Sequence, residues 1–305
     1  MLFSRPLEGV SGRGAVERLS VNQEHRQSSF YAGRASRPMR LGVVSFLNAR
    51  PLIEGLREAC DCQIVYQVPS RLAGLLDEDR VDAASVPVVD YFQRQNAWEI
   101  VSDACIASDG PTWTVRVFSH VPPRDLRVLH VDGDSHTSVV LAQVLWSGYW
   151  RRPIKTRPLS ELPRPEEAEA VLLIGDKVVA ALDRGFAYDV DLGSAWQRWT
   201  GLPMVFALWV AHRDSATPAL ARRLAEARDR GVARAAEIAR LEAAEHGWPS
   251  ELAERYLTQI LQYRITGRHH EGMRRFREEA ARLGLFQGEA AADGQTRQRV
   301  LTCPP

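Results

Sequence analysis

Apolar positions in the first third of the chain fall into two repeating patterns. Short continuous apolar runs, bounded by turn residues, cover residues 40–46, 63–68 and 81–86. Each run is followed by a segment whose apolar residues fall on one face of a helix. Runs of the first kind predict buried strands, and segments of the second kind predict helices. Strand and helix therefore alternate three times, which predicts a parallel sheet covered by helices.

A second unit of the same kind is expected further along the chain. Two β-prone runs, 100–106 and 113–119, flank a polar turn and should carry the chain across to a second sheet. Apolar runs at 126–131 and 169–176 predict strands of that sheet.

The remaining segments of the second unit differ in character. A helical period begins at Thr137, and a polar, proline-rich connection follows at 151–168. Residues 191–200 predict a short helix that Gly201 stops. The very apolar run 202–210 is expected to be the strand that returns the chain to the first unit.

Beyond residue 210 the pattern predicts helices only. A long helix is expected over 217–245, with a threonine as its N-cap and a proline as its first residue. Two further helices are expected over 250–265 and 269–285. The last residues, 287–305, are polar and are expected to form a frayed tail.

These elements predict an α/β fold of two lobes, with a ligand cleft between them and a helical C-terminal segment. The first α/β domain is expected to combine 39–118 with 204–286, and the second to cover 119–203. Residues 1–38 carry six arginines among serines and glycines and no continuous apolar segment, so we expect no secretory signal peptide. We interpret them as a disordered extension or an over-long reading frame, because Met39 stands directly before the first strand.

The composition gives no support for binding to nucleic acid, membranes or metal ions. The 305 residues are 45% hydrophobic and 25% charged, and the net charge is +1. This balance gives no reason to expect nucleic acid or an anionic membrane as a partner. No apolar run approaches the roughly 18 residues that span a bilayer. The four cysteines lack the spacing of a zinc site and are expected to be reduced thiols in a cytoplasmic protein, so no metal is predicted.

The loops beyond the carboxyl ends of the strands are the candidate site, because open α/β sheets bind their ligands there. Four of the five loops carry hydroxyl or amide groups. This pattern indicates a pocket that holds its ligand mainly by hydrogen bonds. The five loops are 45–48, 85–87, 108–114, 132–138 and 175–176.

Loop 132–138 is the strongest candidate, because a strand, a hydroxyl-rich turn and a helix follow one another there. The N–H groups at a helix N-terminus lack partners and carry a partial positive charge. Ser135, Thr137 and Ser138 would add hydroxyl donors, and we interpret the loop as a cradle for a carboxylate or phosphate. Ser135 or Thr137 as a plain helix cap is the alternative, and the two roles are compatible. His136, between them, is a candidate acid or cation.

Other polar residues leave their roles open. The amide of Asn48 can bind a ligand or cap a helix. Thr112 and Thr114 are favoured as ordinary strand residues, and Asp176 as the N-cap of the helix that follows it. His130 is expected in the core. The sequence shows neither a catalytic triad nor a metal cluster.

Five blocks of sequence stand out, the first four at these loops and the fifth in the predicted helix and return strand. They are Val44-Ser45-Phe46-Leu47-Asn48-Ala49-Arg50-Pro51-Leu52, Val86-Pro87-Val88-Val89-Asp90-Tyr91, Ser135-His136-Thr137-Ser138, Leu173-Ile174-Gly175-Asp176, and Trp196-Gln197-Arg198-Trp199-Thr200-Gly201-Leu202-Pro203-Met204-Val205-Phe206-Ala207-Leu208-Trp209. Together, and in this order, they resemble the menaquinone-biosynthesis family of chorismate dehydratase. The resemblance covers about residues 39–286.

The resemblance implies a fold like that of type II periplasmic binding proteins and a hydro-lyase that acts on chorismate. The implied product, formed in the futalosine route to menaquinone, is 3-[(1-carboxyvinyl)oxy]benzoate. Because the reaction creates an aromatic ring, it has its own driving force, and no cofactor is expected. Chorismate is then the small-molecule partner. A homodimer is compatible with the sequence, which specifies no interface.

The resemblance also implies roles for individual residues. Asn48 matches a family asparagine that would orient the substrate or its leaving hydroxyl, and Ser135, Thr137 and Ser138 match a carboxylate-binding Ser-x-Thr-Ser turn. Thr114 stands where the family usually has a serine, and His136 where an arginine is common. We therefore expect Asn48 and Thr114 to act in catalysis. The residues expected to bind substrate are Ser45, Ser108, Ser135, His136, Thr137, Ser138 and Asp176.

Two other functions are compatible with the same resemblance. The related 1,4-dihydroxy-6-naphthoate synthase shares the fold and the pathway, although the first block looks more like the dehydratase. A non-catalytic small-carboxylate-binding protein of this fold would need an export signal, and none is expected in residues 1–38. The sequence offers no obvious general base. We hypothesise that the enolpyruvyl carboxylate of the substrate removes the ring proton.

Overall fold

The computed structural model describes residues 37–59, 61–162, 164, 167–181 and 185–286. The chain divides into a short unit, residues 1–39, and a long unit, residues 40–305, to which the description below applies. The interpretations of the N-terminal extension, of the polar tail, and of Cys60 and Cys303 concern residues that lie outside the described ranges, apart from residues 37 and 38. Cys62 and Cys105 are free thiols.

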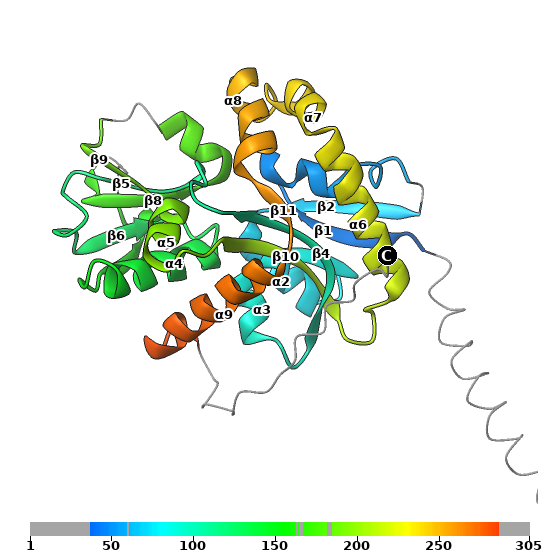
Figure 1. Ribbon diagram of the computed structural model, residues 1–305, viewed down its shortest axis with the longest axis horizontal. Helices are drawn as coiled ribbons and strands as arrows, with labels where there is room; N and C mark the ends of the chain where they lie inside the picture. Colours follow the sequence, from blue (N-terminus) through cyan, green and yellow to red (C-terminus); the bar gives the residue numbers. More distant parts are fainter. Residues whose placement is uncertain (1–36, 60, 163, 165–166, 182–184, 287–305) are drawn as a thin grey trace, which may run out of the picture. The chain divides into compact units, whose positions relative to one another are not determined.

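The first sheet draws its strands from both ends of the long unit. It consists of β1 (Met39–Val44), β2 (Cys62–Gln67), β3 (Ala83–Pro87), β4 (Trp98–Ser108), β10 (Met204–His212) and β11 (Gln262–Arg264). Their spatial order is β11-β4-β10-β3-β1-β2. Figure 1 labels all of these strands except β3. β1 runs parallel to β3, whereas β10 runs antiparallel to both β3 and β4, and β11 antiparallel to β4.

The second sheet comes from the middle of the chain. It consists of β5 (Val115–Ser119), β6 (Val128–Val131), β7 (Lys155–Pro158), β8 (Ala170–Ile174) and β9 (Tyr188–Asp191), in the spatial order β7-β6-β8-β5-β9. β6 runs parallel to β7 and β8, and β5 runs antiparallel to β8 and β9. β5 is therefore a strand of the second lobe, although we expected residues up to 118 in the first.

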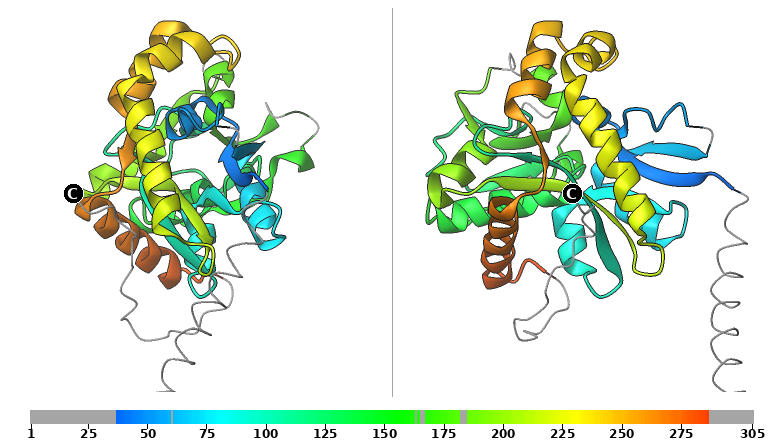
Figure 2. Two further views of the ribbon diagram at one scale, coloured as in Figure 1. Left: turned by 90° about the vertical axis from the view of Figure 1, so that its right-hand side faces the viewer. Right: turned by 45° about the vertical axis from the view of Figure 1, so that its right-hand side comes forward.

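Helices connect the strands of both sheets. Before the crossing to the second sheet they are η1 (Leu47–Ile53, a 3-10 helix), α2 (Pro69–Asp77) and α3 (Val88–Gln93). In the second lobe they are α4 (His136–Gly148), η2 (Leu159–Glu161), η4 (Gly175–Ala181) and α5 (Leu192–Thr200). The C-terminal helices are α6 (Pro218–Ala233), α7 (Ala235–Glu242), α8 (Ser250–Arg255), the π-helix η5 (Tyr256–Ile260) and α9 (Gly267–Arg282). α6 packs against η1 and β4, and Figure 2 shows it crossing the first sheet.

The parallel pairing predicted for the first strands is confirmed for β1 and β3. Both sheets are nevertheless mixed, because β10 and β11 in the first sheet and β5 in the second run antiparallel to their neighbours. Every residue of β3 and of β8 is buried. A fully buried strand is apolar throughout whichever way it pairs, so its sequence does not reveal its direction. β7 and β9 were not predicted, because both are short and mostly exposed and have no apolar run.

The prediction of helices only beyond residue 210 is wrong. The helix expected over 217–245 is divided at Arg234 into α6 and α7. The segment expected as one helix over 250–265 ends its helical part in η5, and β11 then pairs with β4. In β11 the buried Tyr263 stands between exposed neighbours. This alternation is the strand signal that our helical interpretation of the segment overlooked.

The other predicted elements are confirmed. The eight expected strands appear as β1 to β6, β8 and β10, with ends shifted by a few residues. α5 ends at Gly201, whose φ of 72° is the left-handed conformation that glycine adopts readily. α9 forms close to its expected place. Within the described ranges, no helix is both long and apolar enough to cross a bilayer.

Candidate functional site

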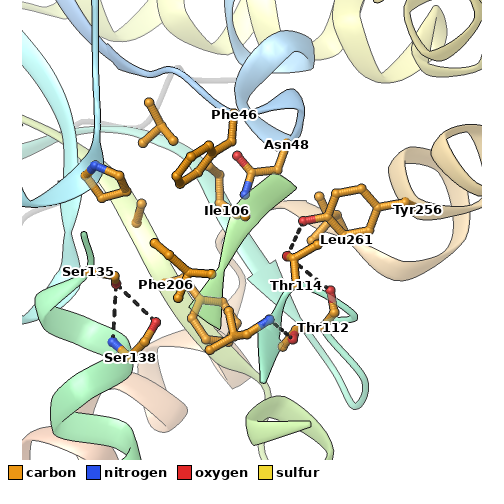
Figure 3. Close-up of a pocket in the computed structure, with 16 residues that line it drawn as sticks. Phe46, Asn48, Ile106, Thr112, Thr114, Ser135, Ser138, Phe206, Tyr256 and Leu261 are labelled. Atoms are coloured by element: carbon orange, nitrogen blue, oxygen red, sulfur yellow. Dashed lines mark hydrogen bonds between the residues drawn. The ribbon is translucent and has the colours of Figure 1, made fainter. Parts of the chain in front are cut away.

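A pocket is lined by loops of both sheets and by η5 (Figure 3). Its walls are mostly apolar, and a small number of hydroxyl and amide groups reach into it. This combination is typical of sites for small molecules. The apolar lining includes Val44, Phe46, Ile106, Ile174, Phe206 and Leu261. The polar lining is Asn48, Thr112, Thr114, Ser135, Ser138 and Tyr256.

The N-terminus of α4 forms one part of the pocket wall. Ser135 is the N-cap of α4, and its Oγ accepts hydrogen bonds from Ser138 N at 3.3 Å and from Ser138 Oγ at 3.1 Å. The predicted cap is thus confirmed. Both hydrogen bonds use the Ser135 oxygen as acceptor, so its own hydrogen can be donated to a ligand. Together with the positive end of the helix, this arrangement suits an anion.

Asn48 brings a side-chain amide into the pocket from η1. The N-cap of η1 is Phe46, so the alternative role of Asn48 as a helix cap is wrong. Its Oδ1 is buried and accepts no hydrogen bond from the described protein. A buried acceptor without a partner costs roughly 1–3 kcal/mol. A ligand hydroxyl at this point would remove that cost.

Thr114 contacts a residue that sequence reasoning missed. Its Oγ1 lies 2.6 Å from the hydroxyl of Tyr256, and both residues are buried. The Tyr256 ring stacks on Trp248, with centroids 4.7 Å apart, and on Trp113 at 6.4 Å. Tyr256 opens a π-helix, a feature common at functional sites. No local pattern pairs it with Thr114, which lies 142 residues earlier.

Tyr256 is the only residue with an ordinary ionisable group in the described lining of this pocket. Burial raises the pKa of Tyr256, and hydrogen bonding with Thr114 and Asn48 opposes that rise. The phenol therefore stays neutral at ordinary pH. The described lining thus holds no protein group that is basic enough to serve as a general base near neutral pH.

The structure brings four of the nine predicted site residues together in the pocket lining. These four are Asn48, Thr114, Ser135 and Ser138. The other five are outside the lining as described, and each makes contacts elsewhere. They are Ser45, Ser108, His136, Thr137 and Asp176.

His136 and Thr137 contact the first lobe. The Thr137 Oγ1 donates to Phe206 O at 3.2 Å and accepts from Val89 N at 3.4 Å. His136 Nδ1 lies 2.8 Å from Asp90 Oδ1, and this hydrogen bond raises the pKa of His136. Both side chains hold the start of α4 against α3 and β10. Their expected roles in substrate binding stay predictions.

Asp176 also connects the lobes. It lies inside the first turn of η4, so the prediction that it is an N-cap is wrong. Its carboxylate accepts hydrogen bonds from His246 Nδ1 at 2.7 Å, Trp248 Nε1 at 2.8 Å and Leu47 N at 3.3 Å. Leu47 begins η1, and the other two donors lie between α7 and α8. Asp176 therefore fastens the second lobe to the first, next to the pocket.

Ser45 and Ser108 form hydrogen bonds within the first lobe and the loop that leaves it. Ser45 N donates to Gln67 O at 2.9 Å, and Ser108 Oγ donates to Gly110 O at 3.2 Å. His130 is buried, as expected of a core residue. Across the described ranges, no cluster of three or more His, Cys, Asp or Glu side chains is arranged to hold a metal ion.

Solved structures of low sequence identity share the fold. A protein from Archaeoglobus fulgidus matches with a TM-score of 0.66 at 17% identity, over 83% of this chain and 100% of that chain. The alkanesulfonate-binding protein SsuA from Xanthomonas axonopodis pv. citri, bound to MOPS, matches with a TM-score of 0.62 at 12% identity, over 83% and 96% of the two chains. These likenesses confirm the two-lobed α/β fold of periplasmic binding proteins.

Sequence comparison relates the chain to a curated relative and to one family. It is 28% identical over 271 residues to the chorismate dehydratase of Thermus thermophilus. The aligned region covers 82% of this chain and 96% of that protein. A family model described as menaquinone biosynthesis matches residues 39–282. Because this match spans most of the chain, the protein belongs to the menaquinone-biosynthesis family.

Proposed function

We propose that the protein is a chorismate dehydratase, which removes water from chorismate to give 3-[(1-carboxyvinyl)oxy]benzoate. Membership of the family and the Thermus thermophilus relative support this reaction. The structural observation that carries it is the buried, unpartnered Oδ1 of Asn48 in a mostly apolar pocket. Such an acceptor suits the ring hydroxyl that leaves.

The pocket offers places for the ring of chorismate, its ring carboxylate and its ring hydroxyl. Phe46 and Phe206 provide apolar surface for the ring. The ring carboxylate fits the N-terminus of α4, where Ser135 and Ser138 lie. With this carboxylate held there, the ring hydroxyl is assigned to Asn48.

The elimination proceeds with the substrate as its own base. The ring carbon that bears the enolpyruvyl ether loses a proton, and the C–H electron pair becomes the third double bond of the ring. The adjacent C–O bond breaks, and its electron pair leaves on the oxygen. This oxygen takes up the proton that the enolpyruvyl carboxylate has accepted from the ring and departs as water. The enolpyruvyl carboxylate accepts the ring proton, because a carboxylate at the positive helix end would be the weaker base.

Asn48 assists this step by accepting a hydrogen bond from the departing oxygen. As that oxygen takes up its second proton, its O–H groups become stronger donors, so the hydrogen bond to Oδ1 strengthens along the reaction. An interaction that is stronger in the transition state than in the ground state accelerates the chemical step. The protein otherwise contributes position and shape.

The alternatives have less support. The curated relative is named a dehydratase, which favours this reaction over the related naphthoate synthase and over a non-catalytic binding protein. The cytoplasmic location and a homodimer stay predictions.

Incubation of the full-length protein with chorismate, followed by liquid chromatography and mass spectrometry, tests the proposal. We expect a product lighter by one water, and turnover about 100-fold lower in Asn48→Ala. Asn96→Ala is the matched control, because Asn96 is exposed and lies outside the pocket lining. Chorismate that binds and stays intact would refute the dehydratase. Near-normal turnover in Asn48→Ala would refute the role of that residue.

A further inference from the structure

We propose that Tyr256 is a positioning residue, which sets the orientation of the Asn48 amide through hydrogen bonds that run from Asn48 over Tyr256 to Thr114. This inference rests on the proposed function, because it gives Tyr256 a part in the same site. It concerns the neutral hydroxyl of Tyr256 and assigns it no proton transfer.

The direction of these hydrogen bonds follows from Thr114. Its Oγ1 donates to Thr112 O at 3.5 Å. Either oxygen could donate in the 2.6 Å contact between Thr114 and Tyr256. A hydroxyl has a single hydrogen, so we assign the Tyr256 hydroxyl as the donor there and Thr114 as the acceptor. The Tyr256 oxygen is left with lone pairs that can accept a hydrogen bond.

We assign the amide nitrogen of Asn48 as the donor to that oxygen, because it is the end of the amide that lies on the side of Tyr256. Asn48 lowers the pKa of Tyr256, which means that it favours the negative form of the phenol. Only the N–H end of an amide has this effect. Figure 3 shows the Asn48 nitrogen on the side of Tyr256 and Thr114 and the oxygen on the other side, toward Phe46. The unpartnered Oδ1 is therefore the end of the amide that a substrate hydroxyl can use.

The Tyr256 hydroxyl matters because the two ends of an amide have nearly the same size. Without it, rotation of the Asn48 amide by half a turn would present N–H groups to the substrate hydroxyl where an acceptor is needed. The tyrosine ring itself is held by stacking on Trp248 and Trp113, which does not involve the hydroxyl. Tyr256→Phe therefore removes the orienting hydroxyl and leaves the ring in place.

Activity and spectroscopy of the full-length protein test this inference together. We expect Tyr256→Phe to lower kcat for chorismate roughly tenfold and to change KM less than about twofold. The effect should not add to that of Asn48→Ala, because both changes remove the same interaction. Tyr263→Phe is the matched control, since Tyr263 is a buried tyrosine whose hydroxyl has no partner in the described protein and which is outside the pocket lining.

A second readout does not depend on turnover. In an ¹⁵N-labelled sample, the Asn48 side-chain NH₂ resonances, assigned by their loss in Asn48→Asp, should shift in Tyr256→Phe and stay in place in Tyr263→Phe. A purely structural role of Tyr256 would lower the melting temperature and leave the two substitutions additive in kcat.

The outcomes separate this inference from the proposed function. Suppose that the wild type turns over chorismate. If Tyr256→Phe then leaves kcat unchanged, or if its effect on kcat adds to that of Asn48→Ala, the inference is overturned and the dehydratase proposal stands. No turnover in the wild type overturns the dehydratase, and the NMR result then decides whether Tyr256 orients Asn48. Unshifted Asn48 resonances in Tyr256→Phe overturn the inference in either case.

Discussion

Replacing Asp176 by alanine distinguishes a contact between the lobes from a contact with substrate. The sequence predicts that Asp176 binds substrate, whereas the structure shows its carboxylate accepting hydrogen bonds from His246, Trp248 and Leu47. If these contacts are its main role, the substitution should act on stability. If it binds chorismate, the substitution should act on KM.

The expected loss of stability follows from the donors left behind. The His246 side chain is 8% exposed and Trp248 is 5% exposed, so both N–H groups would lose an acceptor where water has little access. Each such group costs roughly 1–3 kcal/mol. The 3.3 Å contact with Leu47 N is longer and adds less. Because Asp176 itself is 18% exposed and some water can enter, we expect a total loss of about 2–4 kcal/mol.

Urea unfolding followed by tryptophan fluorescence measures this loss, and the chorismate assay measures KM on the same samples. Asp77→Ala is the control, because it breaks an exposed ion pair with Arg94 and should change the unfolding free energy by less than about 1 kcal/mol. Asp176→Ala should lower the unfolding free energy by the larger amount and change KM less than about threefold. Unchanged stability together with a large rise in KM would refute the reasoning.

Two further predictions concern contacts around the pocket. Because Asp90 raises the pKa of His136, their ion pair stabilises the fold below the ordinary histidine pKa, and this stabilisation fades as the pH rises through the raised value. The loss of unfolding free energy in His136→Gln, measured with urea, should be larger at pH 5 than at pH 9. It should stay below about 1 kcal/mol, because His136 is 47% exposed. Equal losses at the two pH values would contradict this prediction. Gly175→Ala should lower the melting temperature more than Gly133→Ala. Both glycines have positive φ, but of the two only Gly175 would place a Cβ against another residue, 2.5 Å from the Phe46 ring. Equal losses in melting temperature would show that this contact is harmless.

Local features of the site could be predicted from the sequence, whereas contacts between distant segments could not. The N-cap at Ser135 depends on residues within one helical turn, so the order of strand, turn and helix was enough to find it. The pocket position of Asn48 followed from its loop at the end of β1. Tyr256 and the partners of Asp176 depend on how the C-terminal segment packs. No pattern in that segment shows which loop it will cover.

The prediction of β-strands was limited in the same way. Buried strands such as β3 and β10 have apolar runs that are visible in the sequence. β7 and β9 form at sheet edges with mostly exposed side chains, so their pairing depends on the neighbouring strand rather than on their own composition.

The start of α4 explains why only part of the predicted cradle lines the pocket. Residues three positions apart lie on the same side of a helix, and each residue in between is turned by about 100°. Ser135 and Ser138 accordingly share the pocket side, while His136 and Thr137 turn toward Asp90 and Val89 of the first lobe. His136 therefore lies at a contact between the lobes, and the hydroxyls that reach the pocket from the start of α4 are those of Ser135 and Ser138.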